Sequence, residues 1–286
     1  MSLRFLHISD IHLLDLSGVS LSRYLNKRFT GRVNLALRRS HAHDERLFDE
    51  VLEMIPRLGV ERLVITGDLT NLSLEPEFAL VQRKLRASPV PVTIIPGNHD
   101  TYTHGSARAQ RFESFLAEFM EGEREGNELY PFVWRDQDVA LIGVSTAIAT
   151  PPLYAVGRVG PEQLARLEKV LEATAAEGLC RIVLIHHPVV DGVSKPRHDL
   201  VDRGAFAEVI ARQGAELILH GHEHRRIDSE LPGPAGQVPV HGVSSGTCVS
   251  EKPGREASFS VYDATAEHIQ RELYTWNGSE FQARPD

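Results

Sequence analysis

The stretch LRFLHISDIH at residues 3–12 is an apolar run that ends directly in Asp10 and His12. Short apolar runs of this kind are typical of buried strands. Polar side chains that follow such a run lie at the carboxyl end of the strand, where open α/β sheets place their ligands. The stretch therefore predicts the first strand of an α/β sheet and the first part of a site.

Four further apolar runs end in polar residues in the same way. They are RLVIT at 62–66 before Gly67–Asp68, VTII at 92–95 before GNHD at 97–100, RIVLI at 181–185 before His186–His187, and LILH at 217–220 before GHEH at 221–224. Helical patterns occur between the runs, at about 44–58, 76–87, 106–120, 161–176 and 204–212. Alternating strands and helices predict a layered α/β fold.

The C-terminal part reads instead as consecutive strands, at 238–247, 257–264 and 268–276, which we expect to extend a second sheet. No linker, repeat or low-complexity segment divides the chain. A single domain over 1–286 is therefore predicted, with an unusually long connection at about 13–43.

Composition narrows the functional classes. The 286 residues carry a net charge of −8, which argues against a stable nucleic-acid partner. The two cysteines, Cys180 and Cys248, do not suggest a disulfide scaffold, and no apolar run resembles a signal peptide or a membrane span. We expect a cytoplasmic protein, while its oligomeric state is not readable from the sequence.

The residue types at the strand ends suit divalent cations. Carboxylate and amide oxygens and neutral imidazole nitrogens are the ligands that such ions prefer. Two cations about 3.5–4 Å apart need an anion between them to offset their repulsion, and Asp68 could supply one oxygen to each. Each motif alone is weak evidence, and a lone Gly-Asp is usually a turn. All five together, each after an apolar run, predict a metal site.

The set of motifs resembles the calcineurin-like metallophosphoesterase superfamily, whose pattern is D-x-H, G-D, G-N-H-D/E, H and G-H-x-H. Here it reads DIH at 10–12, GD at 67–68, GNHD at 97–100, HH at 186–187 and GHEH at 221–224. The resemblance implies a four-layer α-β-β-α sandwich of two mixed sheets flanked by helices. It also implies a hydrolase with a binuclear metal centre of two divalent ions, with Mn, Fe or Zn as the expected metals.

The resemblance also implies residue roles. One metal would be held by Asp10, His12, Asp68 and His224, and the other by Asp68, Asn98, His186 and His222. His99 would stabilise the transition state or protonate the leaving group. His187 is expected to support the ligands or to contact substrate. A hydroxide that bridges the metals would attack phosphorus.

Asn71 bears on the subfamily. It replaces the acidic residue that orients the catalytic histidine in protein phosphatases of the superfamily, and the Tyr ligand of purple acid phosphatases. TGDLT followed by IIPGNHD is similar to bacterial class III cyclic-nucleotide phosphodiesterases. The expected function is therefore hydrolysis of a phosphodiester, with a small or cyclic nucleotide as the small-molecule partner. Two alternatives are a hydrolase of a lipid-linked phosphodiester or pyrophosphate and a metal-dependent binding protein without catalysis.

The connection at 13–43 interleaves basic and apolar residues at spacings of about one helical turn. It is either an ordinary solvated insertion or a cap beside the metal site, where Arg28, Arg32 and Arg38 would bind an acidic or lipid-linked substrate. A basic amphipathic segment also leaves open a peripheral membrane contact through 13–43.

Overall fold

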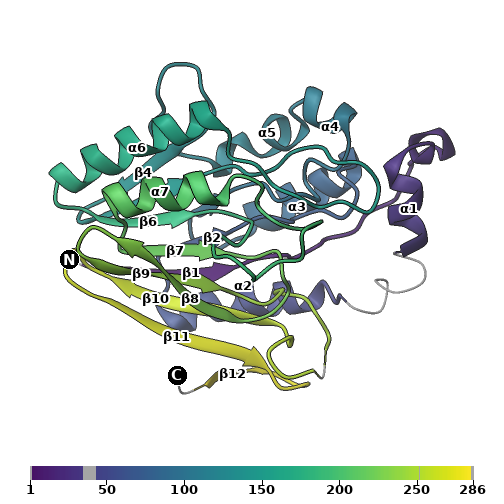
Figure 1. Ribbon diagram of the computed structural model, residues 1–286. Coiled ribbons are helices and arrows are strands. Elements are labelled where there is room, and N and C mark those ends of the chain that lie inside the picture. Colours follow the sequence, from purple (N-terminus) through teal and green to yellow (C-terminus); the bar gives the residue numbers. More distant parts are fainter. Residues whose placement is uncertain (1, 35–42, 251, 285–286) are drawn as a thin grey trace.

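The computed structural model describes residues 2–34, 43–250 and 252–284. Two mixed sheets of six strands each pack face to face, and helices cover their outer faces (Figure 1). This architecture is the α-β-β-α sandwich predicted from the sequence. The single domain over 1–286 stays a prediction.

The first sheet contains the first three strands and the last three. Its order is β12-β11-β10-β1-β2-β3, in which β1, β2 and β3 run parallel and the C-terminal strands run antiparallel. The bounds are β1 Leu3–Ile8, β2 Arg62–Ile65, β3 Val92–Ile94, β10 Ser258–Ala264, β11 Ile269–Trp276 and β12 Phe281–Arg284.

The second sheet has the order β4-β5-β6-β7-β9-β8, with β5, β6, β7 and β9 parallel. The bounds are β4 Phe132–Asp136, β5 Val139–Gly143, β6 Cys180–Leu184, β7 Leu217–His220, β8 Ile227–Gly233 and β9 Gly236–Gly242. The C-terminal strands were expected to extend a second sheet together, and this expectation is corrected. Strand β9 joins the second sheet, whereas β10 to β12 extend the first.

The two-residue period of a strand places the core on both faces of the second sheet. In β6, Ile182 and Leu184 belong to an apolar cluster that contains residues of both sheets. Val183 points the other way, into a cluster with α6 (Pro161–Ala176) and α7 (Arg203–Gln213). A strand buried on both faces reads as a continuous apolar run, which explains why RIVLI was recognisable.

Four other helices of the main body are α2 Arg46–Leu58, α3 Glu75–Arg86, α4 His104–Arg108 and α5 Arg111–Leu116, the last followed by the 3-10 turn η3 Ala117–Phe119. The single helix expected at 106–120 is therefore broken into three short pieces. Strands β4, β8 and β12 were not predicted. They are edge strands, and an edge strand such as β8 has few buried positions and hence little apolar pattern.

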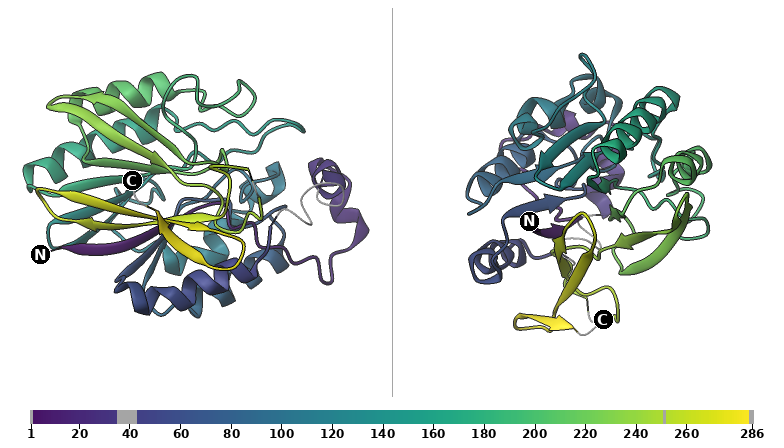
Figure 2. Two further views of the ribbon diagram at one scale, coloured as in Figure 1. Left: turned by 90° about the horizontal axis from the view of Figure 1, so that it is seen from below. Right: turned by 90° about the vertical axis from the view of Figure 1, so that its left-hand side faces the viewer.

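The segment after β1 forms a small cap. It contains the 3-10 helix η1 Leu21–Tyr24 and the helix α1 Lys27–Asn34, which stand away from the sheets at one end of the molecule (Figures 1 and 2). Gly31 lets α1 come close, because a Cβ there would lie 2.6 Å from the Leu72 side chain and 2.7 Å from the Tyr102 hydroxyl. Among the described residues, no helix is both long and apolar enough to cross a bilayer.

Candidate metal centre

The candidate ligands all follow the carboxyl ends of parallel strands. Asp10, Asp68 and Asn98 come after β1, β2 and β3 of the first sheet. His186 follows β6, and the pair His222 and His224 follows β7 of the second sheet. The structure thus brings side chains from two sheets to one end of the sandwich.

Several of these residues have an unusual backbone. Positive φ angles occur at Asp10 (54°), His12 (44°), Asp68 (54°), His222 (75°) and His224 (48°). A left-handed conformation at a residue other than glycine costs on the order of 1 kcal/mol or more, and such residues cluster at functional sites. Of these five residues, Asp10, His12, Asp68 and His224 also have side chains that lie close together.

Asp10, His12, Asp68 and His224 form the more compact of the two predicted sets. One ligand atom from each lies within 4.8 Å of the others. His12 Nε2 is 3.1 Å from His224 Nε2 and 3.8 Å from Asp68 Oδ2, while His224 Nε2 is 3.2 Å from Asp10 Oδ1. Asp10 Oδ1 is nevertheless a buried oxygen without a hydrogen-bond partner, as expected for an atom that would face a cation.

The second set, Asp68, Asn98, His186 and His222, is more open. His186 Nε2 is 3.2 Å from Asn98 Oδ1 and 3.5 Å from Asp68 Oδ1. The ring of His222 lies 5.2 Å from that of His186, between centroids. Asp68 thus lies between the two sets, with Oδ2 toward His12 and Oδ1 toward His186.

Backbone carbonyls determine which ring nitrogen can face a metal. A carbonyl oxygen only accepts, so the nitrogen beside it must carry hydrogen. His12 Nδ1 lies 3.2 Å from the Thr70 oxygen, and His186 Nδ1 lies 2.7 Å from the Thr66 oxygen, which leaves Nε2 of both rings toward the carboxylates. In His222 the nitrogen bonded to a carbonyl is Nε2, which lies 2.8 Å from the backbone oxygen of residue 198. Nδ1 is therefore the nitrogen of His222 that could bind a metal. Metal-binding histidines are commonly oriented in this way.

The charges of the site also fit cations. Burial acts to raise the pKa of Asp68, but His186 and His99 outweigh it and hold the pKa well below its usual range. For Asp10, burial is likewise outweighed, chiefly by His224, and its pKa is lowered. Burial lowers the pKa of His12 well below its usual value, so this ring is neutral. Two carboxylates and a neutral imidazole form a donor set that suits a divalent ion.

His99 stands at the edge of this group. Its Nδ1 lies 2.6 Å from the Asn71 carbonyl oxygen, and its backbone N–H donates to Asp68 Oδ1 at 2.7 Å. The ring stacks on Tyr102 with centroids 5.2 Å apart and meets His12 edge-on at 4.9 Å. Because Nδ1 donates to the carbonyl, Nε2 is the atom that remains for proton transfer.

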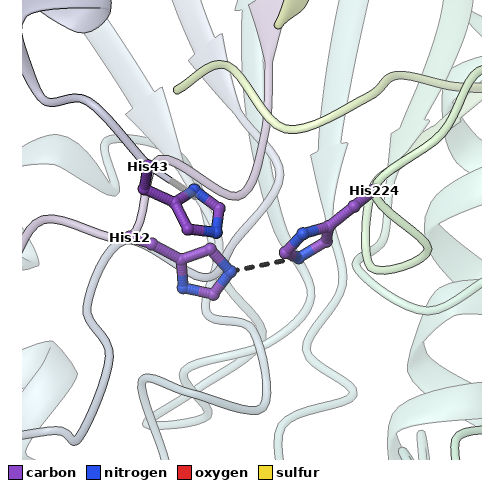
Figure 3. A group of neighbouring side chains, drawn as sticks. All are labelled: His12, His43 and His224. Carbon is purple, nitrogen blue, oxygen red and sulfur yellow. Dashed lines mark hydrogen bonds between the residues drawn. The ribbon is translucent and has the colours of Figure 1, made fainter. Parts of the chain in front are cut away.

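His43 is a site residue that the sequence did not single out. It joins His12 and His224 in a second compact group, and Figure 3 shows the three rings converging. Its Nδ1 lies 3.0 Å from Thr247 Oγ1, and its ring centroid lies 4.8 Å from that of His12. Since His43 lies 31 positions after His12 in the sequence, no local motif could have revealed the contact.

Asp100 is a second residue whose role was not foreseen. Its carboxylate accepts hydrogen bonds from the backbone N–H groups of Gly97 at 2.9 Å, Leu69 at 3.2 Å and Thr70 at 2.9 Å. It therefore ties the loop after β3 to the loop after β2. Asp100 is the last residue of the GNHD motif, so the motif did mark its position. Its spacing could not show that the carboxylate binds backbone N–H groups.

Of the two roles expected for His187, the structure favours support of the ligands over contact with substrate. Its Nδ1 lies 2.7 Å from Thr146 Oγ1, and its Nε2 lies 3.0 Å from the Ala155 carbonyl oxygen. Both ring nitrogens are therefore engaged within the protein, and the side chain is fully buried. His187 packs against the ring of His222, 4.3 Å away, and can support that residue rather than meet substrate.

The expected basic contacts of the cap also need correction. Arg28 is only 4% exposed, and its guanidinium donates to the carbonyls of Leu72 at 2.7 Å and Ser73 at 2.8 Å. It therefore fastens α1 to the body instead of reaching for substrate. Arg32 lies in α1, but its side chain, like the whole of Arg38, lies outside the described residues.

The pattern of the calcineurin-like phosphoesterases matches residues 3–226, which include all five motifs. The chain belongs to the calcineurin-like phosphoesterase family. The Asp/His cluster described above could hold a metal ion. The family resemblance expected from the motifs is confirmed.

Two relatives of this chain carry phosphodiesterase names. A probable glycerophosphodiester phosphodiesterase, GpdQ, of Arcobacter nitrofigilis is 26% identical over 57% of this chain and 56% of its own length. A 3′,5′-cyclic adenosine monophosphate phosphodiesterase, CpdA, of Haemophilus influenzae is 28% identical over 72% of this chain and 69% of its own. The chain thus spans little more than half of the first of these relatives.

Solved structures support the fold. A dimetal phosphatase from Danio rerio aligns with a TM-score of 0.62 and 15% identity, over 98% of each chain. A purple acid phosphatase from yellow lupin aligns with the same TM-score and 11% identity, over 99% of this chain and 53% of that one.

Proposed function

We propose that this phosphoesterase hydrolyses a phosphodiester, with a small or cyclic nucleotide as the substrate class. The observation that carries the proposal is the arrangement of His12, His186 and His222. Each has one nitrogen bonded to a backbone carbonyl, and in His12 and His186 the other nitrogen lies toward Asp68. The phosphodiesterase names of the relatives favour a diester substrate.

The ligand assignments belong to this proposal. Asp10, His12, Asp68 and His224 would hold one divalent ion, and Asp68, Asn98, His186 and His222 would hold the other. Bound there, the two ions would neutralise phosphate charge and make a water molecule nucleophilic. Mn, Fe or Zn would suit these oxygen and nitrogen donors.

The chain's own contribution to the reaction centres on His99. With Nδ1 donating to the Asn71 carbonyl, a protonated His99 can direct only its Nε2 hydrogen outward. We assign that proton to the leaving oxygen as the bond to phosphorus breaks. Asp100 positions this residue indirectly, because it holds the loop on which His99 lies.

A substrate panel tests the proposal. The Mn-loaded protein should hydrolyse bis(p-nitrophenyl) phosphate and a cyclic nucleotide with higher kcat/KM than p-nitrophenyl phosphate. Asp68→Asn should remove the activity, and Asp49→Asn, on the outer surface of α2, should not. Activity confined to the monoester, or retained in full by Asp68→Asn, would contradict the proposal.

A second candidate is hydrolysis of a lipid-linked phosphodiester or pyrophosphate. The cap favours it through three apolar side chains at helical spacing: Leu21 is 77% exposed, Leu25 85% and Phe29 61%. Their basic neighbours Arg23 and Arg28 turn toward the body. An apolar outer face above a phosphodiesterase site suits a substrate held at a lipid surface.

Vesicle binding separates the two candidates. For the lipid substrate, the protein should sediment with phosphatidylglycerol vesicles, and the double variant Leu25→Ser/Phe29→Ser should not. A matched variant on another face, Val249→Ser, should bind as well as the wild type, because Val249 is also exposed. No sedimentation of the wild type would leave the soluble nucleotide as the substrate class. The metal-dependent binding protein without catalysis is disfavoured, because the chain retains both ligand sets and His99.

A further inference from the structure

A cavity of about 660 Å³ lies between the cap and the loop that follows His99. Its described lining includes four basic side chains and no carboxylate; the basic ones are Arg23, Lys27, Arg28 and Arg111. The whole chain has a net charge of −8, so this concentration of positive charge runs against the overall composition. A concave basic site of this size can enclose an anionic group.

Nearby carboxylates balance this charge only in part. Arg23 and Arg111 share Glu75, with Arg111 Nη2 2.8 Å from Glu75 Oε1. The guanidinium of Arg28 bonds to two backbone carbonyls. Buried Glu77, which also lies near Arg28, accepts hydrogen bonds from backbone N–H groups. Asp68 also acts electrostatically on Lys27. Even with all three carboxylates ionised, the basic side chains outnumber them by four to three.

Lys27 connects this cavity to the catalytic histidine. Its Nζ donates to Thr150 Oγ1 at 2.6 Å and to the Tyr154 carbonyl at 3.0 Å, and it lies 4.5 Å from the centre of the Tyr102 ring. Tyr102 also contacts His99, whose ring stacks on it with the two centroids 5.2 Å apart. The ammonium group and the residue assigned to proton transfer thus contact the same aromatic ring.

The position of His99 indicates which of the two groups esterified to the phosphorus of a diester would reach the cavity. A residue that protonates the leaving oxygen must lie on the leaving-group side of phosphorus. Tyr102 contacts His99, Lys27 contacts Tyr102, and Lys27 lines the cavity, so the cavity lies next to His99. The leaving half of a bound diester would therefore extend along Tyr102 toward Lys27.

We propose that this cavity, the leaving-group cleft, binds a second anionic group carried by the leaving half of the substrate, with Lys27 as its principal contact. The proposal rests on the phosphodiesterase function above and narrows its substrate class. The favoured substrate is a small nucleotide diester whose leaving alcohol bears a further phosphate. Burial lowers the pKa of Lys27 to about 8, so a bound anion would also stabilise its charged form.

The reaction itself stays a hydrolysis. The oxygen of water forms a new bond to phosphorus, and the bond from phosphorus to the leaving oxygen breaks. That oxygen takes its proton from His99, and a proton of the attacking water returns to the medium or to His99. The phosphate in the cleft undergoes no chemistry and leaves with the alcohol.

Two dinucleotides that differ by one phosphate provide the test. ApA and its 5′-phosphorylated form pApA have the same scissile diester, but only pApA has an additional anion on the half that leaves through its 3′-oxygen. The Mn-loaded wild type should cleave pApA to two AMP with a kcat/KM at least tenfold higher than for ApA, mainly through KM. Charge-assisted hydrogen bonds support an effect of this size.

Three variants identify the residue responsible. Lys27→Met should reduce the preference for pApA about tenfold, whereas Lys27→Arg should retain most of it. The matched control Lys169→Met removes a lysine from the surface of α6, where it pairs with Glu125, and should keep the wild-type ratio. The ratio of the two substrates is the readout, so a general loss of activity does not imitate the result.

A binding measurement separates the cleft from the catalytic function. Pyrophosphate should bind metal-free wild type in calorimetry and should bind Lys27→Met at least tenfold more weakly, whether or not any diester is cleaved. Equal kcat/KM for ApA and pApA, or equal pyrophosphate binding by both proteins, would overturn the leaving-group cleft. Failure of the phosphodiesterase proposal is seen separately, as absent hydrolysis of bis(p-nitrophenyl) phosphate.

Discussion

His99 Nδ1 lies 2.6 Å from the carbonyl oxygen of Asn71, so a backbone atom orients the ring assigned to proton transfer. The Asn71 side chain is turned away and donates to the His12 carbonyl at 2.6 Å. The residue that replaces an orienting acid in the sequence thus performs that task through its main chain. This arrangement needs no carboxylate beside the imidazole.

The first prediction separates chemistry from metal binding at His99. His99→Ala should lower kcat for a diester with a poor leaving group by about 10²–10⁴-fold, because the proton donor is lost. With bis(p-nitrophenyl) phosphate the loss should be smaller, since that leaving group needs little protonation. Metal content, measured by elemental analysis, should stay near that of the wild type. A metal-depleted variant would show that His99 is part of the ligand set.

A second prediction concerns the carboxylate between the two ligand sets. Asp68→Asn should weaken the binding of both cations, because one substitution removes negative charge from both sets. Calorimetric titration with Mn²⁺ should show two weakened binding events. Asp49→Asn is the matched control, since Asp49 pairs with Lys84 on the surface. Loss of one event with the other unchanged would place Asp68 in a single set.

The third prediction is a pH dependence of metal binding. Burial acts to lower the pKa of His186, but Asp68 outweighs it and raises the pKa to about 9 in the metal-free protein. Below that pH a cation must displace the His186 proton, so affinity should rise as pH increases toward 9, by up to about tenfold per unit. Titrations at pH 7.5 in buffers of different ionisation enthalpy should reveal about one proton released. Affinity that does not change between pH 7 and 9 would contradict this.

A fourth prediction addresses His43. His43→Ala should weaken one of the two cation-binding events, because its ring converges with His12 and His224. The effect should be smaller than that of His12→Ala, since His43 is absent from the group that includes both carboxylates. Co²⁺ absorption spectra, which respond to ligand number, provide the measurement. His268→Ala, on the exposed turn before β11, should leave the spectrum unchanged.

Local sequence was sufficient to predict a layered α/β fold and the order of the strand-end motifs, and the family resemblance added the sandwich. A strand buried on both faces must be apolar throughout, and a residue directly after a parallel strand must lie at its carboxyl end. Asp10, Asp68 and His222 could therefore be located from their motifs and the apolar runs that precede them. Edge strands such as β8 were not predicted, because a strand exposed to solvent has little apolar pattern.

Tertiary structure alone decided the direction and the partners of individual side chains. Arg28 was expected to face substrate, but the close approach of α1 at Gly31 turns its guanidinium onto two backbone carbonyls. His187 follows a predicted ligand in the chain, yet its ring is enclosed by Thr146 and the carbonyl at 155. The sequence determines which groups arrive at the strand ends, because strand direction is a local property. Which of them meet depends on contacts between segments far apart in the chain, and these form only when both sheets and the cap have packed.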